Sequence, residues 1–232
     1  MPRKAELSNH PIDITDDNVS PRVLLVDDHD LFRTGLRNLL EEQGVHVVGE
    51  ADTGTEALRQ VREVAPDVVV MDLNMPGISG VEATRQISMI APLTRVLVLT
   101  ISDQDGDVMD AIYAGACGYL LKDASIQELM QGIRAASVGE SLVSPTIAAK
   151  VLQRVRASSA SQHEAATIQS ELSDREIEVL KLIANGKDNA MIAGELHISP
   201  KTVKNHISNI LMKLQIDNRI QAAVYAVRSG IV

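Results

Sequence analysis

The chain alternates short apolar runs with amphipathic stretches between residue 22 and about residue 140. Three of the runs are dense in Val and Leu without polar alternation, which is typical of strands buried on both faces of a parallel sheet. The runs are 23–26, 45–49, 68–71, 96–99 and 118–121, and the expected helices are 31–43, 54–64, 80–90, 104–114 and 126–137. This order predicts a doubly wound α/β domain with a five-stranded parallel sheet over residues 21–140.

Three of these expected helices begin with the sequence of a capping box, a hydroxyl residue three positions before a Glu. The pairs are Thr53 with Glu56, Ser79 with Glu82, and Ser125 with Glu128. In such a box the hydroxyl accepts from the backbone N–H of the Glu, and the Glu side chain accepts from the N–H of the capping residue. We therefore expect reciprocal caps at these helix starts.

The pattern changes outside this domain. Residues 1–20 lack periodicity and predict a flexible leader. Residues 141–171 predict a linker, first helical over 145–156 and then flexible where Ser, Ala and Gln dominate. Residues 172–232 predict a second, smaller all-α domain with no strand, and its expected helices are 174–184, 189–196, 200–214 and 218–229.

Composition argues for a cytoplasmic protein with no membrane association. The chain is 45% apolar, yet no apolar stretch approaches the roughly 20 residues that span a bilayer. The polar N-terminus lacks the apolar core of a signal peptide. The single cysteine, Cys117, cannot form an internal disulfide, which suits a reducing compartment.

Charge is distributed unevenly. The whole chain carries −9, whereas residues 172–232 hold eight Lys or Arg against six Asp or Glu, a net charge of +2. A mildly basic C-terminal domain on an acidic body is compatible with DNA binding by that domain alone.

Chemistry-bearing residues gather where the expected strands end. Asp27 and Asp28 follow the first strand, Asp72 the third, Thr100 the fourth and Lys122 the fifth. In a doubly wound sheet, ligands bind beyond the carboxyl ends of the strands. Taken singly, an Asp after a strand is more often a helix cap or a solvated loop residue, and a Thr or Lys there is less informative still. The combination at four strand ends favours a functional site.

Three carboxylates in one crevice repel each other unless a cation neutralises them. An all-oxygen site favours a hard ion, and Mg²⁺ fits. An Asp carboxylate is itself a nucleophile for phosphoryl transfer, and positive charge must stabilise the transferred group. Asp72 is the expected nucleophile because it leaves a central strand and precedes a turn sequence, while Lys122 and Thr100 would contact the phosphoryl oxygens.

This region resembles the flavodoxin-like receiver domain of two-component response regulators. The resemblance is carried by Leu25-Val26-Asp27-Asp28-His29, Val70-Met71-Asp72-Leu73-Asn74-Met75-Pro76-Gly77, Leu99-Thr100 and Gly115-Ala116-Cys117-Gly118-Tyr119-Leu120-Leu121-Lys122. It implies that Asp72 is the phosphoacceptor and that Asp28 and Asp72 bind Mg²⁺ with help from Asp27 and the backbone carbonyl of Asn74. It also implies that Thr100 and Tyr119 form a switch pair that reorients on phosphorylation.

The expected helix over 200–214 is the informative one in the C-terminal domain. Ser199 is a good N-cap with Pro200 at the first helical position. Apolar residues at 203, 207, 210 and 214 form a buried stripe. Lys201, Lys204, Asn205 and Ser208 lie opposite, where the second helix of a helix-turn-helix meets base edges and phosphates. For any one of these residues, a solvated polar face is the more ordinary explanation.

Residues 172–232 resemble the LuxR/NarL-type helix-turn-helix domain. The carriers are Leu172-Ser173-Asp174-Arg175-Glu176, Ile192-Ala193-Gly194-Glu195-Leu196, Ile198 to His206, and Lys213-Leu214. The resemblance implies DNA contacts from Ser199, Lys201, Thr202, Lys204, Asn205 and Ser208, and dimerisation through 218–229. Ala190 and Ser208 depart from the family, which often has basic residues there. Fewer phosphate contacts predict weaker and less salt-sensitive binding.

Together the two domains resemble a response regulator of the NarL/FixJ type. The hypothesis is a phosphorylation-dependent transcriptional regulator that a sensor histidine kinase activates, and that binds double-stranded DNA as a homodimer. It predicts no enzymatic turnover beyond stoichiometric, Mg²⁺-dependent autophosphorylation from a phosphodonor. The main alternative is a DNA-binding regulator that uses the receiver only to dimerise. A phosphatase is disfavoured because Asn74 stands where such hydrolases place a second Asp, and a flavin domain because no phosphate-binding loop follows the first strand.

Overall fold

The computed structural model describes residues 20–102, 104–143, 147–148, 150–151 and 172–232. The expected leader, apart from Ser20, lies outside these residues, as does most of the expected linker. Of the expected connecting helix, residues 147, 148, 150 and 151 are described and helical, and Ile147 and Val151 are buried. Within the described residues, no helix combines the length and apolarity needed to cross a bilayer.

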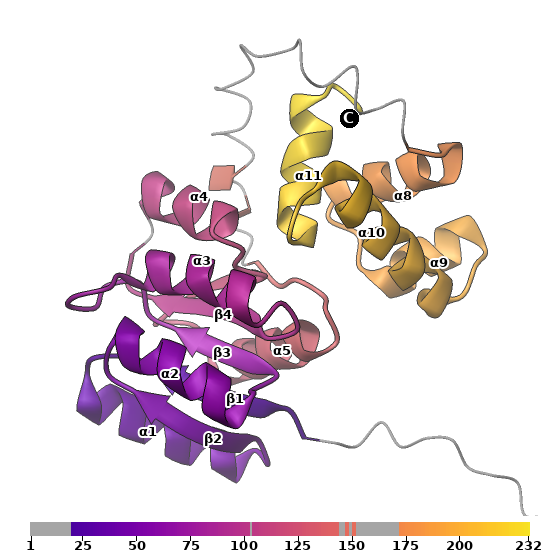
Figure 1. The fold of residues 1–232 in the computed structure, drawn as a ribbon. Coiled ribbons are helices and arrows are strands. Elements are labelled where there is room, and N and C mark those ends of the chain that lie inside the picture. Colours follow the sequence, from indigo (N-terminus) through magenta and orange to yellow (C-terminus); the bar gives the residue numbers. More distant parts are fainter. Residues whose placement is uncertain (1–19, 103, 144–146, 149, 152–171) are drawn as a thin grey trace, which may run out of the picture.

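The N-terminal domain contains the predicted five-stranded parallel sheet, with strand order β2-β1-β3-β4-β5 (Figure 1). The chain crosses from β2 at one edge over β1 to β3, so the strand order reverses beside β1. The strands are β1 Arg22–Val26, β2 His46–Ala51, β3 Val68–Met71, β4 Arg95–Thr100 and β5 Gly118–Leu121. The doubly wound fold class is therefore confirmed. Strand β1 begins one residue earlier than predicted, β2 begins one residue later and ends two residues later, and β4 extends one residue further at each end.

Helices cover both faces of the sheet because alternate strand residues point to opposite sides. In β1, Val23 and Leu25 pack with α1 and α5, whereas Leu24 and Val26 pack with α2 and α3. Both faces of the sheet are thus buried, which explains the unbroken apolar runs. The helices are α1 Asp30–Glu42, α2 Gly54–Val64, α3 Gly80–Ile90, α4 Asp105–Tyr113 and α5 Ile126–Ser137.

The capping predictions for this domain were right for one helix and wrong in part for two. Ser125 at the start of α5 forms a complete capping box with Glu128. Thr53 and Ser79 accept from the expected backbone N–H groups, but their Glu partners do not reach back. The Glu56 carboxylate instead accepts from Arg59 and Gln60, and the Glu82 carboxylate from Arg85 and Gln86. Side chains three and four positions on compete for the carboxylate, because these positions share its helix face.

The C-terminal domain is all helical, as predicted. Its helices are α8 Asp174–Ala184, α9 Asn189–Leu196, α10 Pro200–Leu214 and α11 Arg219–Arg228. The predicted stripe of α10 is buried at Val203, Ile207, Ile210 and Leu214. It packs in one core with Val179, Leu180 and Ile183 of α8 and with small residues of α11.

Helix α11 lies between the two domains (Figure 1). Ala222 and Ala226 pack into the core of the C-terminal domain. Ile220 and Val224 pack instead into a cluster with Ile112 of α4. Because residues two apart on a helix face different directions, one short helix buries two faces. The described structure is therefore closed, with α11 seated on α4.

Polar contacts reinforce this seating. The side-chain amide of Gln221 donates to the Ile112 carbonyl at 2.8 Å, and that of Asn218 donates to the same carbonyl at 3.4 Å. Asn189 donates to the Glu140 carboxylate at 2.9 Å and accepts from Arg219 at 2.7 Å. The last turn of a helix leaves carbonyl groups without an intrahelical partner. The C-terminal domain thus supplies two donors to the end of α4.

The start of α8 carries a buried carboxylate. Glu176 is 4% exposed, completes a capping box with Ser173, and accepts from Lys213 of α10 at 2.7 Å. Burial raises the pKa of this carboxyl, but the hydrogen bonds from Lys213 and Ser173 outweigh burial and lower the pKa below its usual value. The ionised form therefore links α8 to α10.

We expect Glu176→Gln to lower the free energy of unfolding of the C-terminal domain by about 1–3 kcal/mol, the usual cost of weakening a buried, charge-assisted hydrogen bond. Urea denaturation measures this loss. Glu178→Gln is the matched control, because Glu178 pairs with Arg175 on the exposed side of the same helix, where ion pairs contribute little.

The decrease in the free energy of unfolding caused by Glu176→Gln also depends on pH, in a defined direction. Because folding lowers the pKa of this carboxyl, its contribution is complete above the ordinary pKa of 4.5 and disappears as the pH falls through the folded pKa. Equal stability of the two variants at pH 7 would contradict the assignment.

Candidate functional site

The predicted residues at the strand ends meet along one edge of the sheet. Asp27 follows β1 and Asp72 follows β3, the two strands beside the reversal of strand order. Lys122 follows β5 and extends to both carboxylates, with Nζ 2.7 Å from Asp27 Oδ2 and 2.8 Å from Asp72 Oδ2. A crevice at such a reversal is the usual ligand site of an open α/β sheet.

These charges are largely withdrawn from water. Asp27 is 4% exposed and Asp72 is 2% exposed. Burial lowers the pKa of Lys122, but the hydrogen bonds and charges of Asp27 and Asp72 outweigh burial, so its pKa is raised above the ordinary value. The ammonium also lies 4.7 Å from the centre of the Phe32 ring, a cation–π contact. Lys122 is thus a fixed positive charge at neutral pH.

The acidic residues are arranged as a cation site requires. One ligand atom from each of Asp27, Asp28, His29 and Asp72 lies within 4.8 Å of the others. Asp28 Oδ1 is buried and accepts no hydrogen bond, although His29 Nδ1 lies 2.9 Å away. An unsatisfied buried carboxylate oxygen is costly, and a bound cation would satisfy it. Carboxylate oxygens are hard ligands, so this donor set fits Mg²⁺.

Asn74 and Thr100 lie beside Asp72. The Asn74 backbone N–H donates to Asp72 Oδ1 at 3.3 Å, and its side-chain amide lies 3.5 Å from the hydroxyl of Thr100. Thr100 is fully buried at the end of β4. Asn74, in the loop after β3, therefore contacts both Asp72 and the Thr100 hydroxyl at the end of β4.

Gly80, the first residue of α3, holds this loop close to the helix. Its backbone N–H donates to the Leu73 carbonyl at 3.1 Å. A Cβ atom at this position would lie 2.0 Å from the carbonyl oxygen of Asp72. Because no side chain fits in that space, glycine is required where α3 meets the backbone of Asp72.

Tyr119, the other predicted switch residue, occupies a different position from the acidic cluster. Its ring is fully buried, and its hydroxyl donates to the carbonyl of Ser102 at 2.8 Å, two residues beyond Thr100. The ring belongs to the cluster that also contains Ile147, Ile220 and Val224. Tyr119, in the strand that leads to Lys122, therefore belongs to the surface against which α11 packs.

The predicted DNA-contacting residues occupy an open surface. Ser199 caps α10 by accepting from the Thr202 backbone N–H at 3.1 Å. The side chains of the two lysines and their polar neighbours on α10 are exposed, namely Lys201, Lys204, Asn205 and Ser208. The N-terminal part of α10 is thus free to approach a ligand in the closed structure, whereas α11 is not.

The prediction from sequence omitted two residues beside the acidic cluster. His29 directly follows the acidic pair and joins the cluster. Arg33, one turn into α1, donates to the Asp27 carbonyl. The position of His29 directly after the acidic pair was an available signal, whereas no sequence motif displays the backbone carbonyl that Arg33 contacts.

Comparison with known proteins agrees with this architecture. The sequence model of the response regulator receiver domain family matches residues 23–134. The sequence model of the bacterial regulatory proteins of the luxR family matches residues 170–226. The transcriptional regulatory protein LiaR of Bacillus subtilis is 47% identical over 212 residues, which cover 91% of this chain and 99% of LiaR.

Solved structures give the same result. A two-component response regulator of the LuxR family from Aurantimonas has a TM-score of 0.56 and 41% identity, covering 59% of this chain and 98% of that one. The response regulator RcsB in complex with DNA has a TM-score of 0.54 and 25% identity, covering 90% of this chain and 99% of that one. The chain therefore belongs to the two-component transcriptional response regulators that join a receiver domain to a LuxR-type DNA-binding domain.

Proposed function

We propose that Asp72 accepts a phosphoryl group from a sensor histidine kinase and that Mg²⁺ is required. The supporting observation is the convergence of three carboxylates and one ammonium on the switch point of the sheet. Asp27, Asp28, Asp72 and the backbone carbonyl of Asn74 would hold Mg²⁺. When bound, the ion supplies positive charge to the phosphoryl oxygens.

The residues of the chain have separate roles in this transfer. A carboxylate oxygen of Asp72 attacks phosphorus, the bond from phosphorus to the donor breaks, and its electron pair leaves with the donor, which gives an acyl phosphate. Lys122, already beside Asp72, neutralises charge on the transferred group. The hydroxyl of Thr100 donates to a phosphoryl oxygen. The receiver is consumed stoichiometrically in this step and does not turn over as an enzyme.

We expect incubation with a small phosphodonor and Mg²⁺ to add the mass of one phosphoryl group to the wild type and none to Asp72→Asn, because an amide is a poor nucleophile. Intact-protein mass spectrometry measures this. Asp52→Asn is the matched control, since Asp52 is an exposed aspartate directly after β2, another strand of the same sheet. Phosphorylation that persists in Asp72→Asn would refute the assignment.

We further propose that α10 enters the major groove of double-stranded DNA. Ser199, Lys201, Thr202, Lys204, Asn205 and Ser208 would provide the contacts. The exposure of this face supports the assignment, and the helix N-terminus favours phosphate. Asn205 is suited to adenine and the lysines to guanine or phosphate.

We expect Lys204→Ala to weaken binding to a B-form duplex and to reduce the slope of log affinity against log salt concentration by about 0.9 per lost phosphate contact. Fluorescence anisotropy over a range of salt concentrations measures the slope. Lys181→Ala, at an exposed position in α8, removes the same charge elsewhere and should leave the slope nearly unchanged. An equal effect of both variants would refute a specific role for α10.

Phosphorylation, we propose, releases α11 from α4 so that α11 mediates homodimerisation on DNA. Burial of Ile220 and Val224 against the receiver supports this order of events, because a helix face cannot pack on two partners at once. Glu140 lies on the receiver side of the same contact and faces Asn189 and Arg219. The alternative, a receiver that only dimerises, predicts equal DNA affinity for wild type and Asp72→Asn under phosphorylating conditions.

We expect Glu140→Ala to open the unphosphorylated protein. Burial lowers the pKa of Arg219, which nevertheless keeps its charge, and Glu140 is the receiver carboxylate that stabilises that charge. Loss of about 1 kcal/mol from the closed state should raise amide hydrogen exchange in α11 several-fold and shift sedimentation towards the dimer. Glu42→Ala, at an exposed position of α1, is the control. Unchanged exchange in α11 would contradict the proposed release.

A further inference from the structure

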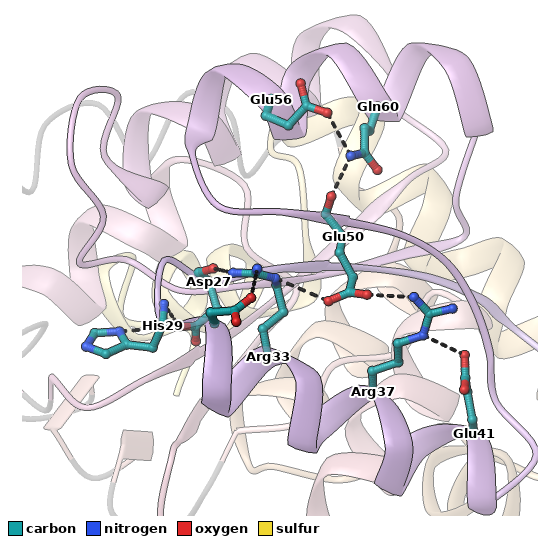
Figure 2. A network of polar contacts seen from close by, with 9 residues as sticks. Asp27, His29, Arg33, Arg37, Glu41, Glu50, Glu56 and Gln60 are labelled. Carbon is teal, nitrogen blue, oxygen red and sulfur yellow. Dashed lines mark hydrogen bonds and ion pairs between the residues drawn. The ribbon is translucent and has the colours of Figure 1, made fainter.

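Two arginines of α1 reach the same carboxylate but differ in what else they touch (Figure 2). Arg33 Nε lies 3.2 Å from one Glu50 oxygen, and Arg37 Nη1 lies 2.6 Å from the other. The Arg33 side chain is 12% exposed, whereas that of Arg37 is 43% exposed. Arg37 continues to Glu41 at the surface, while Arg33 turns towards the acidic cluster. Arg37 is therefore a matched control for Arg33, because both bind Glu50 but only Arg33 contacts the acidic cluster.

Arg33 makes its most protected contact with backbone. Its Nη1 donates to the carbonyl oxygen of Asp27 at 2.6 Å. It also pairs with Asp30 at 2.7 Å, but that carboxylate is 87% exposed, and exposed ion pairs contribute little. The bond to Asp27 and the partly buried ion pair with Glu50 therefore define where the guanidinium lies.

Besides the ion pair of its carboxylate with Lys122, Asp27 makes three further contacts. Its N–H donates to the Ala51 carbonyl at 3.0 Å, which extends the pairing of β1 with β2. Its carboxylate accepts from the His29 N–H at 2.9 Å. Its carbonyl makes the third contact, and Arg33 supplies the donor. Because this carbonyl belongs to the peptide that joins Asp27 to Asp28, the hydrogen bond from Arg33 acts on the backbone between the two acidic residues.

Arg33 also lines a small cavity at the site. Arg33, Asp27 and Asp72 line one cavity of about 10 Å³, and apolar residues of α1, β1, β3 and β4 complete its wall. That is about the space of a single water molecule. Displacement of the Arg33 side chain would therefore disturb the packing beside two carboxylates of the cluster.

We propose that Arg33 is a positioning residue for the phosphorylation site, anchored by Glu50, which sets the geometry of Asp27 and Asp28 for Mg²⁺. It touches neither the phosphoryl group nor the ion in this role. The inference rests on the proposed function, since it concerns the same cation site. It adds a residue that acts through the backbone of a ligand, and such outer contacts commonly change metal affinity by 10–100-fold.

The test compares Arg33→Lys with Arg37→Lys in the full-length chain. Both substitutions keep the positive charge but lose the fork of donors that a guanidinium provides. Isothermal titration with MgCl₂ alone gives the Kd, and thermal unfolding reports the structural cost. We expect Arg33→Lys to raise the Kd for Mg²⁺ by roughly tenfold, and Arg37→Lys to stay within about twofold of the wild type, since Arg37 has no contact with Asp27 among its hydrogen bonds.

Each outcome decides the matter. Equal Kd values for the two variants would reduce Arg33 to a structural residue, even where both variants lower the melting temperature. If Arg33→Lys does not fold, Glu50→Gln weakens the anchor while keeping Arg33, and an unchanged Kd in that variant would overturn the proposal. Failure of the wild type itself to bind Mg²⁺ would refute the proposed function, which separates the two hypotheses.

Discussion

The structure depends on the contact of one ammonium with two buried carboxylates. Asp27 and Asp72 leave adjacent strands and are buried, with carboxylate oxygens within 4.8 Å of each other, and like charges this close require compensation by an opposite charge. Lys122 supplies that compensation from the far edge of the sheet, 2.7 Å and 2.8 Å from the two groups. The folded chain can therefore keep a cluster of negative charge before any cation or phosphoryl group arrives. A phosphoryl group on Asp72 would add charge where this balance is already tight.

Strand β5 connects that balance to the other domain. Lys122 directly follows β5, and Tyr119 lies within it, three residues earlier. The ring of Tyr119 packs in the same cluster as Ile220 and Val224 of α11. Its backbone N–H donates to the Leu142 carbonyl at 3.1 Å, so the chain beyond α5 also lies against this strand. A shift of β5 would therefore move both Lys122 at the acidic cluster and Tyr119 at the contact with α11.

Much of this could be predicted from sequence because the relevant signals are local. Apolar runs without alternation identify buried parallel strands, and parallel strands bring Asp27, Asp72 and Lys122 to one edge whatever the loops do. The reciprocal caps do not form at Thr53 and Ser79 because residues three and four positions after each Glu donate to its carboxylate instead. Local pattern thus predicts which elements form better than it predicts which side-chain bond prevails.

The closed arrangement could not be predicted in this way. Two pairs, Ile220 with Val224 and Ala222 with Ala226, show that α11 is apolar on two faces, but not which surface covers each. A second copy of the helix would satisfy the same pattern. The role of Arg33 was equally hidden, because its acceptor is a backbone carbonyl, which no sequence motif displays.

The chemistry of the contact between α4 and α11 favours a reversible association over a permanent one. The Ile112 carbonyl, which accepts hydrogen bonds from Gln221 and Asn218, lies in the last turn of α4. Once this helix end is exposed, water can donate to the carbonyl in place of the two amides. Opening therefore leaves no orphaned polar group on α4, and Arg219 regains hydration. The free-energy cost of opening comes mainly from exposing the apolar side chains of α11, and a second α11 helix in a dimer would cover those again. A contact whose polar part water can replace, and whose apolar part a second α11 could cover, meets the physical requirements of the proposed switch.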